Sequence, residues 1–208
     1  MSPTMGASRR WWRLLVLVLV SVVVAALWRE AHARRVRVLR RAEAPKVYGT
    51  VPEAVLTDQQ GRTVRLSALH GTPWIASFIF TRCAGQCPMI AARMAELQRR
   101  LPAEPLTRLV SFTMDPVYDT PERLREYGMR YGADERWLFL AAPAGTIFTI
   151  SRQGFKLGAE PQGGTPAEPI LHSVRLVLVD AEGRIRGYYD STEPGVVDRL
   201  LQDVAALR

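Results

Sequence analysis

The residues of this 208-residue chain best suited to chemistry are its two cysteines, Cys83 and Cys87, which are separated by Ala-Gly-Gln. They follow an apolar run and precede a helical pattern, so we expect them at the start of a helix with Cα atoms about 6 Å apart. That separation suits either a disulfide or the chelation of one metal ion. The N-terminus of a helix favours the thiolate that both reactions need.

A third ligand is expected from the histidines. Two thiolates completed by one imidazole suit copper, because sulfur selects Cu(I) and nitrogen also accommodates Cu(II). Of the three histidines, His172 is the best placed, because it follows a segment rich in Gly and Pro and leads into a strand, whereas His32 and His70 lie elsewhere. The alternatives are a histidine that caps a strand or is satisfied in the core, and a structural disulfide or buried apolar role for the cysteines. A zinc site of three or four cysteines is excluded, because the chain has two.

Strand and helix signals alternate from about residue 48 onward, and they must position these side chains. Strand signals cover 55–57, 63–66, 74–80, 106–113, 137–140, 174–179 and 184–189, and helix signals cover 88–101, 121–131, 144–152 and 194–207. The segment 158–169 reads as a loop. This order, with a reactive loop after the first buried strand, predicts an α/β protein with a thioredoxin-like fold.

The charge of the chain is concentrated at its N-terminus. The net charge is +8. Residues 1–46 hold ten basic and two acidic residues, so the net charge of the other 162 residues is zero. This distribution argues against a nucleic-acid partner for the globular part. Residues 14–28 are apolar except for Ser21, and with Trp11 and Trp12 they approach the length that crosses a bilayer.

We therefore predict four parts: a cytoplasmic N-terminus at 1–10, a transmembrane helix at 11–28, a basic linker at 29–47 and a folded domain at 48–208. The rival interpretation of the apolar segment is a cleaved signal peptide, with Ala31-His32-Ala33 as the cleavage site. A retained anchor is favoured by Arg29 and Glu30, which stand just before that site. The count of arginines on the two sides of the segment alone favours a cytoplasmic C-terminus.

Three motifs, in order, resemble the Sco/SenC family of copper-binding, thioredoxin-like proteins. They are Phe80-Thr-Arg-Cys-Ala-Gly-Gln-Cys-Pro88, Met114-Asp-Pro-Val-Tyr-Asp-Thr-Pro-Glu122, and His172-Ser173 leading into Val177-Leu-Val-Asp180. The resemblance spans about residues 48–207.

The resemblance implies a copper site and a location. It implies one copper ion bound by Cys83, Cys87 and His172, with Asp115 and Asp119 as acidic residues around the ligands. It further implies a protein of the inner membrane with one transmembrane pass, its domain facing the periplasm or another extracytoplasmic space, that helps assemble the binuclear copper centre of cytochrome c oxidase. This location decides the orientation against the arginine count.

Two functions follow from these residues. The first is a copper chaperone that passes its ion to the copper-bearing subunit of the oxidase by ligand exchange. The second is a thiol:disulfide reductase in which Cys83 and Cys87 form the redox pair and keep a partner's cysteines reduced. His172 discriminates between them, because a dithiol enzyme does not need it. A peroxidatic cysteine enzyme is disfavoured, because Thr81 stands two residues before Cys83 instead of at peroxiredoxin spacing.

Overall fold

The computed structural model describes residues 11–12, 15–16, 18–25, 28–30, 46–104, 106–160 and 171–207. The chain divides into two compact units, 1–44 and 45–208. Within the first unit the described residues are helical. Over the described part of the chain, no helix combines the length and the apolar character needed to cross a bilayer. The anchor at 11–28 is only partly described and stays a prediction, and most of the linker at 29–47 lies outside the described residues.

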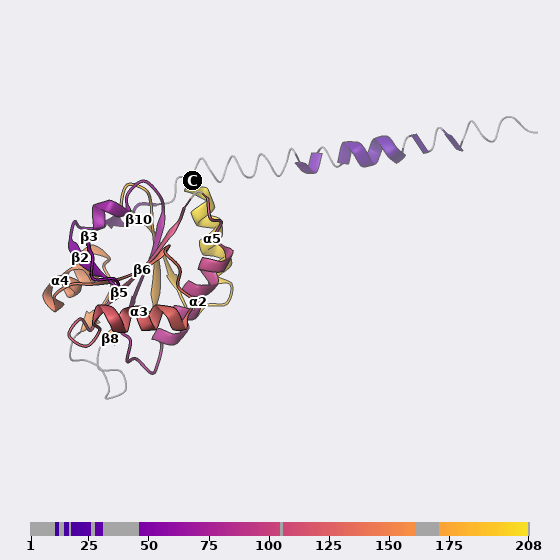
Figure 1. Ribbon diagram of the computed structural model, residues 1–208. Helices are drawn as coiled ribbons and strands as arrows, with labels where there is room; N and C mark the ends of the chain where they lie inside the picture. The colour runs from indigo at the N-terminus through magenta and orange to yellow at the C-terminus, as the bar shows by residue number, and fades with distance from the viewer. Residues whose placement is uncertain are drawn as a thin grey trace, which may run out of the picture. The chain divides into compact units, whose positions relative to one another are not determined.

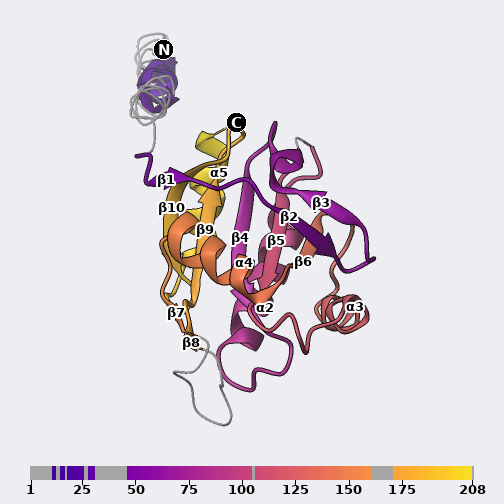
Figure 2. The same cartoon turned by 90° about the vertical axis from the view of Figure 1, so that its left-hand side faces the viewer.

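The second unit is built on one mixed sheet of eight strands in the order β1-β10-β9-β4-β5-β6-β2-β3 (Figures 1 and 2). These strands are β1 (Gly49–Thr50), β2 (Val55–Asp58), β3 (Thr63–Arg65), β4 (Trp74–Ile79), β5 (Arg108–Thr113), β6 (Trp137–Ala141), β9 (Arg175–Val179) and β10 (Arg184–Asp190). A separate pair joins β7 (Ala159–Glu160) to β8 (Leu171–His172). The alternating strands and helices of the predicted α/β class are confirmed.

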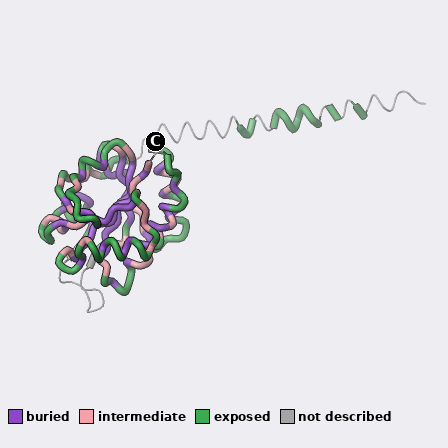
Figure 3. Tube along the Cα trace, viewed as in Figure 1, coloured by how far each residue is buried: buried purple, intermediate pink, exposed green. Residues whose placement is uncertain are grey.

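The helical elements cover both faces of the sheet. They are η1 (Leu66–Leu69), α2 (Cys87–Arg100), α3 (Pro121–Arg130), α4 (Ala144–Thr149), η2 (Ile150–Gly154) and α5 (Val196–Ala206). Figures 1 and 2 show α2 and α5 on one face and α4 on the other, while α3 lies beside β6. The buried residues gather in the layer between them, along the central strands (Figure 3).

The centre of the sheet is β4, whose six residues are all buried, as its near-continuous apolar run predicts. It pairs in parallel with β5 and antiparallel with β9. A cluster of rings formed by Trp74, Phe78, Phe112 and Phe155 has centroids 5.1–6.5 Å apart. Because β4 is held on both edges and both faces, the loop that leaves its C-terminal end begins from a fixed point.

Two hairpins share the sequence pattern Asp-x-x-Gly-Arg, in residues 58–62 and 180–184. In each, one carboxylate oxygen of the aspartate accepts hydrogen bonds from the backbone N–H groups two and four residues later, at 2.8–3.1 Å. The other oxygen accepts from the arginine Nε at 2.8 Å. The turn glycines, Gly61 and Gly183, have φ values of 77° and 76°, which disfavour any residue with a side chain.

The structure corrects three boundaries. The predicted strand 63–66 ends at Arg65, and Leu66 begins η1 instead. The predicted helix 144–152 is an α-helix only to Thr149 and continues as a π-helical turn to Gly154. In this turn Phe155 N–H donates to the Ile150 carbonyl at 2.8 Å, which brings the Phe155 ring into the core. The predicted loop 158–169 contains β7, and residues 161–170 lie outside the described part.

Candidate metal centre

The loop after β4 carries both cysteines, and both are buried. Helix α2 begins at Cys87, with Pro88 in its first turn, as the sequence predicts to within one residue. Cys83 N–H donates to the Phe80 carbonyl at 3.2 Å, and Phe80 N–H donates to Cys87 Sγ at 3.5 Å. The loop therefore turns back on the end of β4, and both sulfur-bearing side chains lie beneath the surface at the N-terminus of α2.

Tyr127 of α3 contacts the first residue of α2. Its hydroxyl donates to the Cys87 carbonyl at 3.2 Å, and burial raises the pKa of Tyr127. A raised pKa keeps the phenol neutral at physiological pH, so it remains a hydrogen-bond donor. The contact joins two helices whose relation the sequence pattern does not show.

Asp119 holds the first part of the loop. One carboxylate oxygen accepts from Thr81 Oγ1 at 2.5 Å, the other accepts from Thr113 Oγ1 at 2.5 Å, and Thr81 N–H donates to the carboxylate at 3.1 Å. Burial raises the pKa of Asp119, although the hydrogen bonds from Thr113 and Thr81 act in the opposite direction. Asp119 therefore links the end of β5 to the residue two positions before Cys83.

Asp115 binds the residue next to Cys83. Arg82 Nε donates to its carboxylate at 2.6 Å, and Asp115 N–H donates to Thr113 Oγ1 at 3.0 Å. The Arg82 guanidinium also lies 4.8 Å from the centroid of the Tyr118 ring. The two aspartates that the resemblance places around the ligands thus attach the loop that follows β5 to the cysteine loop. Their place around a bound metal stays a prediction.

The course of the backbone places His172 at the same end of the sheet as the cysteine loop. It pairs with Ala159 in the β7-β8 hairpin, three residues before β9 begins. Because β9 runs antiparallel to β4, its first residues lie at the end of the sheet where β4 gives way to the cysteine loop. Both cartoon views place β8 and that loop at this end of the domain (Figures 1 and 2).

The side chain of His172 lies outside the described residues, as does His32 entirely. Among the described side chains, no group of three His, Cys, Asp or Glu residues is arranged to hold a metal ion. His70 is exposed at the end of η1. The ligand set Cys83, Cys87 and His172 therefore stays a prediction. Its structural support is that the path of the backbone brings all three residues to one end of the sheet.

Sequence reasoning missed Thr81, Arg82, Thr113 and Tyr127 as residues that shape the site. Thr113 is a polar residue at the end of a buried strand, and Thr81 directly follows the apolar run of another. These positions were the sequence signal that could have indicated their role. Such residues need a partner when they are buried, and the carboxylates that follow β5 supply one. Tyr127 gives no such signal, because its place on an apolar helix face reads as ordinary core.

Two substitutions of Asp119 separate its hydrogen bonds from its charge. Asp119→Ala is expected to lower the free energy of unfolding by about 2 kcal/mol, because it leaves the buried Thr113 hydroxyl and the half-buried Thr81 N–H without their acceptor. Asp119→Asn keeps an acceptor oxygen and removes a charge that burial disfavours, so it is expected to cost less than about 1 kcal/mol. Urea unfolding of both variants measures this difference. Equal losses would show that the charge, and not the acceptor, matters.

An α/β domain with a thioredoxin-like arrangement and a buried cysteine pair at a helix start is the class of protein that these observations define. The SCO1/SenC family model matches residues 46–207, and the chain belongs to this family. It is 32% identical over 151 residues to the SCO1 protein homolog of Bacillus subtilis (strain 168), covering 71% of this chain and 77% of that protein.

Two further relatives bear on the site. A candidate copper-binding protein of Stutzerimonas stutzeri is 32% identical over 143 residues, which are 66% of this chain and 68% of the relative. The solved structure of BsSco, described as a member of the Sco family of cytochrome c oxidase assembly proteins with a disulfide switch, has a TM-score of 0.68 and 28% identity. The match covers 79% of this chain and 96% of the BsSco chain. In this chain the compact unit 45–208 contains the whole of the described hydrophobic core, so we expect a fragment of these residues to fold by itself.

Proposed function

We propose that this protein binds one copper ion through Cys83, Cys87 and His172 and serves the assembly of the binuclear copper centre of cytochrome c oxidase. The observation that carries the proposal is the convergence of a buried cysteine pair and the His172 strand at one end of the sheet. Two thiolates and an imidazole form a donor set that fits copper. The copper-binding relative and the oxidase-assembly relative support it.

The chain's own residues would prepare the donors before the ion arrives. Asp119 and Asp115 hold Thr81 and Arg82, so the loop that carries Cys83 starts from a fixed backbone. Cys87 is the first residue of α2, a position at which the helix dipole favours a thiolate, and its Sγ accepts a hydrogen bond from Phe80 N–H. Copper would be the cargo of this site, to be passed to the copper-bearing subunit of the oxidase by ligand exchange.

For the location we propose a single N-terminal transmembrane helix at about 11–28, with the folded domain on the extracytoplasmic side of the inner membrane. The apolar composition of this segment and its flanking tryptophans support the anchor. Protease digestion of intact spheroplasts tests the side of the membrane. Degradation of the domain from outside is expected, and its protection would overturn the proposed orientation.

Anaerobic copper titration of the 45–208 fragment tests the proposal. We expect one copper ion per monomer in the wild type. His172→Ala is expected to weaken the affinity at least about tenfold while circular dichroism stays unchanged, because one of three ligands is lost. His70→Ala is the matched control, since His70 is exposed at the end of η1, and it is expected to bind as the wild type does.

Equal affinity in the wild type and His172→Ala would refute the ligand role of His172. A fragment that binds no copper but reduces a disulfide substrate would identify the protein as a thiol:disulfide reductase with Cys83 and Cys87 as its redox pair. The disulfide switch described for BsSco favours retaining this second function.

A further inference from the structure

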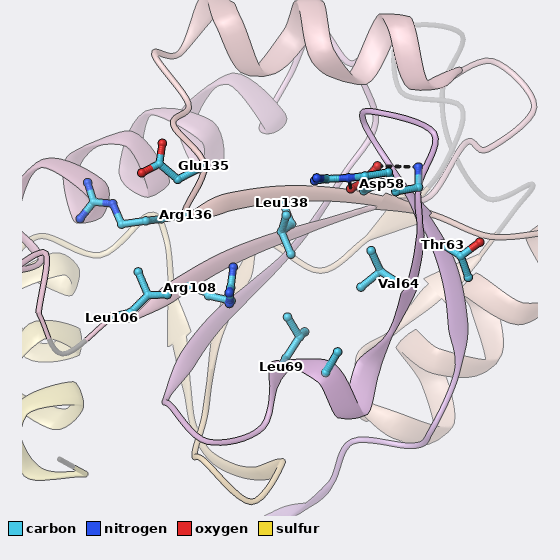
Figure 4. A pocket seen from close by; sticks show the side chains of 11 residues that line it. Asp58, Thr63, Val64, Leu69, Leu106, Arg108, Glu135, Arg136 and Leu138 are labelled. Atoms are coloured by element: carbon cyan, nitrogen blue, oxygen red, sulfur yellow. Dashed lines mark hydrogen bonds and ion pairs between the residues drawn. The ribbon is translucent and has the colours of Figure 1, made fainter.

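A groove of about 600 Å³ lies at the opposite end of the sheet from the cysteine loop. Arg108, at the start of β5, is in register with Trp74 at the start of β4, whereas the cysteine loop follows the end of β4. The groove separates β3 and η1 from the first residues of β5 and β6 (Figure 4). Its volume falls in the range of about 300–1,000 Å³ that is usual for small-molecule sites. It is distinct from the proposed copper site.

The middle of the groove is apolar, and its charged residues surround this part. Figure 4 shows Val64, Leu69, Leu106 and Leu138 around its middle, from four different parts of the chain. Leu69 and Leu138 are buried against the core, and Val64 and Leu106 are half-buried. Apolar side chains that line an open groove gain free energy when an apolar group displaces the water over them. This surface therefore favours a ligand with a hydrocarbon part.

The charged residues of the groove leave one cation without an anion. Three arginines line it, and two of them have carboxylate partners: Arg62 pairs with Asp58 at 2.8 Å, and Arg136 pairs with Asp134 at 2.7 Å. Arg108 is half-buried as a residue, and its guanidinium makes no hydrogen bond or ion pair with any residue that the structure describes. Figure 4 shows this side chain reaching over the groove between Leu106 and Leu138. A cation without a counterion that lies beside apolar side chains favours the entry of an anion.

The geometry points to a small amphipathic monocarboxylate as the ligand of this groove. We propose that its carboxylate binds the Arg108 guanidinium and that its hydrocarbon chain covers Val64, Leu69 and Leu138. A guanidinium matches one carboxylate with two parallel hydrogen bonds. Asp58 and Asp134 already neutralise the other two arginines, and Glu135 adds a further negative charge at the rim, so one anionic charge is favoured over a dianion such as phosphate. Copper binding does not enter this inference, so the two proposals stand or fall separately.

Titration of the 45–208 fragment with octanoate, followed by amide chemical shifts, tests the site. Saturable shifts are expected at residues 64, 69, 106, 108 and 138. Arg108→Gln is expected to weaken octanoate binding at least about tenfold, because it removes the charge-assisted hydrogen bonds. Arg65→Gln is the matched control, since Arg65 is exposed and does not line the groove. Its affinity is expected to stay within about twofold of the wild type.

Two further sets of measurements test whether the hydrocarbon chain of the ligand binds in the groove. Acetate carries the same charge without the chain, and octanol carries the chain without the charge, so each is expected to bind more weakly than octanoate. Ala68→Phe places a ring in the groove from η1 and keeps Arg108, and it is expected to block octanoate. This variant decides the matter if Arg108→Gln does not fold.

The proposal is overturned by any of four results: no saturable octanoate binding up to its solubility limit, equal affinity in a folded Arg108→Gln, unchanged affinity in Ala68→Phe, or shifts confined to another face.

Discussion

Replacing Cys87 with serine is expected to lower the copper affinity of the 45–208 fragment at least about a hundredfold, since changes around ligands alone cost about 10–100-fold. Serine is nearly the size of cysteine but supplies a hydroxyl in place of the soft thiolate that selects Cu(I). Cys87 is fully buried at the start of α2, where its sulfur accepts from Phe80 N–H. A serine oxygen can accept the same hydrogen bond, so the fold is expected to survive.

Competition with a chromophoric Cu(I) chelator under anaerobic conditions measures this loss, with circular dichroism as the check on folding. Cys83→Ser is expected to behave alike, because the two sulfurs bind one ion in the proposed site. Ala84→Ser is the matched control: it adds a serine to the same loop, removes no thiol and is expected to leave the affinity unchanged. Wild-type affinity in a folded Cys87→Ser would show that this cysteine is not a ligand.

The elements that carry the site follow from local sequence, and this part of the prediction holds. The run from Trp74 is apolar at every position of β4 except Ser77, and Pro88 and Thr120 mark the starts of α2 and α3. These signals need only a few neighbouring residues, because strand burial and helix capping are local properties.

The contacts that fix the site are not local, and the sequence does not reveal them. Thr81 and Asp119 are 38 residues apart, and Tyr127 and Cys87 are 40 apart. Such pairs form because the parallel pairing of β4 with β5 brings two loop ends together, which no periodicity encodes. Strand β1, only two residues long, likewise exists through its pairing with β10. The side-chain position of His172 remains a prediction from the chain path.

The largest effect on stability is expected from Asp180 in the second Asp-x-x-Gly-Arg hairpin. Its carboxylate binds Arg184 and also accepts from Arg186 at 2.8 Å. The Arg186 side chain is only 6% exposed, and its Nε has no hydrogen-bond partner among the described residues. Asp180→Asn leaves this buried cation without its counterion, so it is expected to lower the free energy of unfolding by about 4 kcal/mol.

The first hairpin provides the control for this substitution. Asp58 makes the same hydrogen bonds to its turn, but its ion-pair partner Arg62 has a side chain that is 67% exposed. Solvent stabilises Arg62 when the partner is lost, so Asp58→Asn is expected to cost about 1 kcal/mol. Urea unfolding of the 45–208 fragment at pH 7 compares the two. Equal costs would contradict the role assigned to Arg186.

The same pair predicts how stability depends on pH. Burial alone would raise the pKa of Asp180, but hydrogen bonds from Arg184 and Arg186 outweigh it and hold the pKa below its ordinary value. The folded state then binds fewer protons than the unfolded state, so the stabilisation is complete above the unfolded pKa of about 3.9 and is lost as the pH falls through the folded pKa. Below that point wild-type Asp180 is protonated and resembles asparagine. The difference between the wild type and Asp180→Asn is therefore expected to stay constant from pH 7 down to about pH 4 and to shrink as the pH falls further, through the folded pKa. A difference that stays constant below about pH 4 as well would show that the ion pair is not its source.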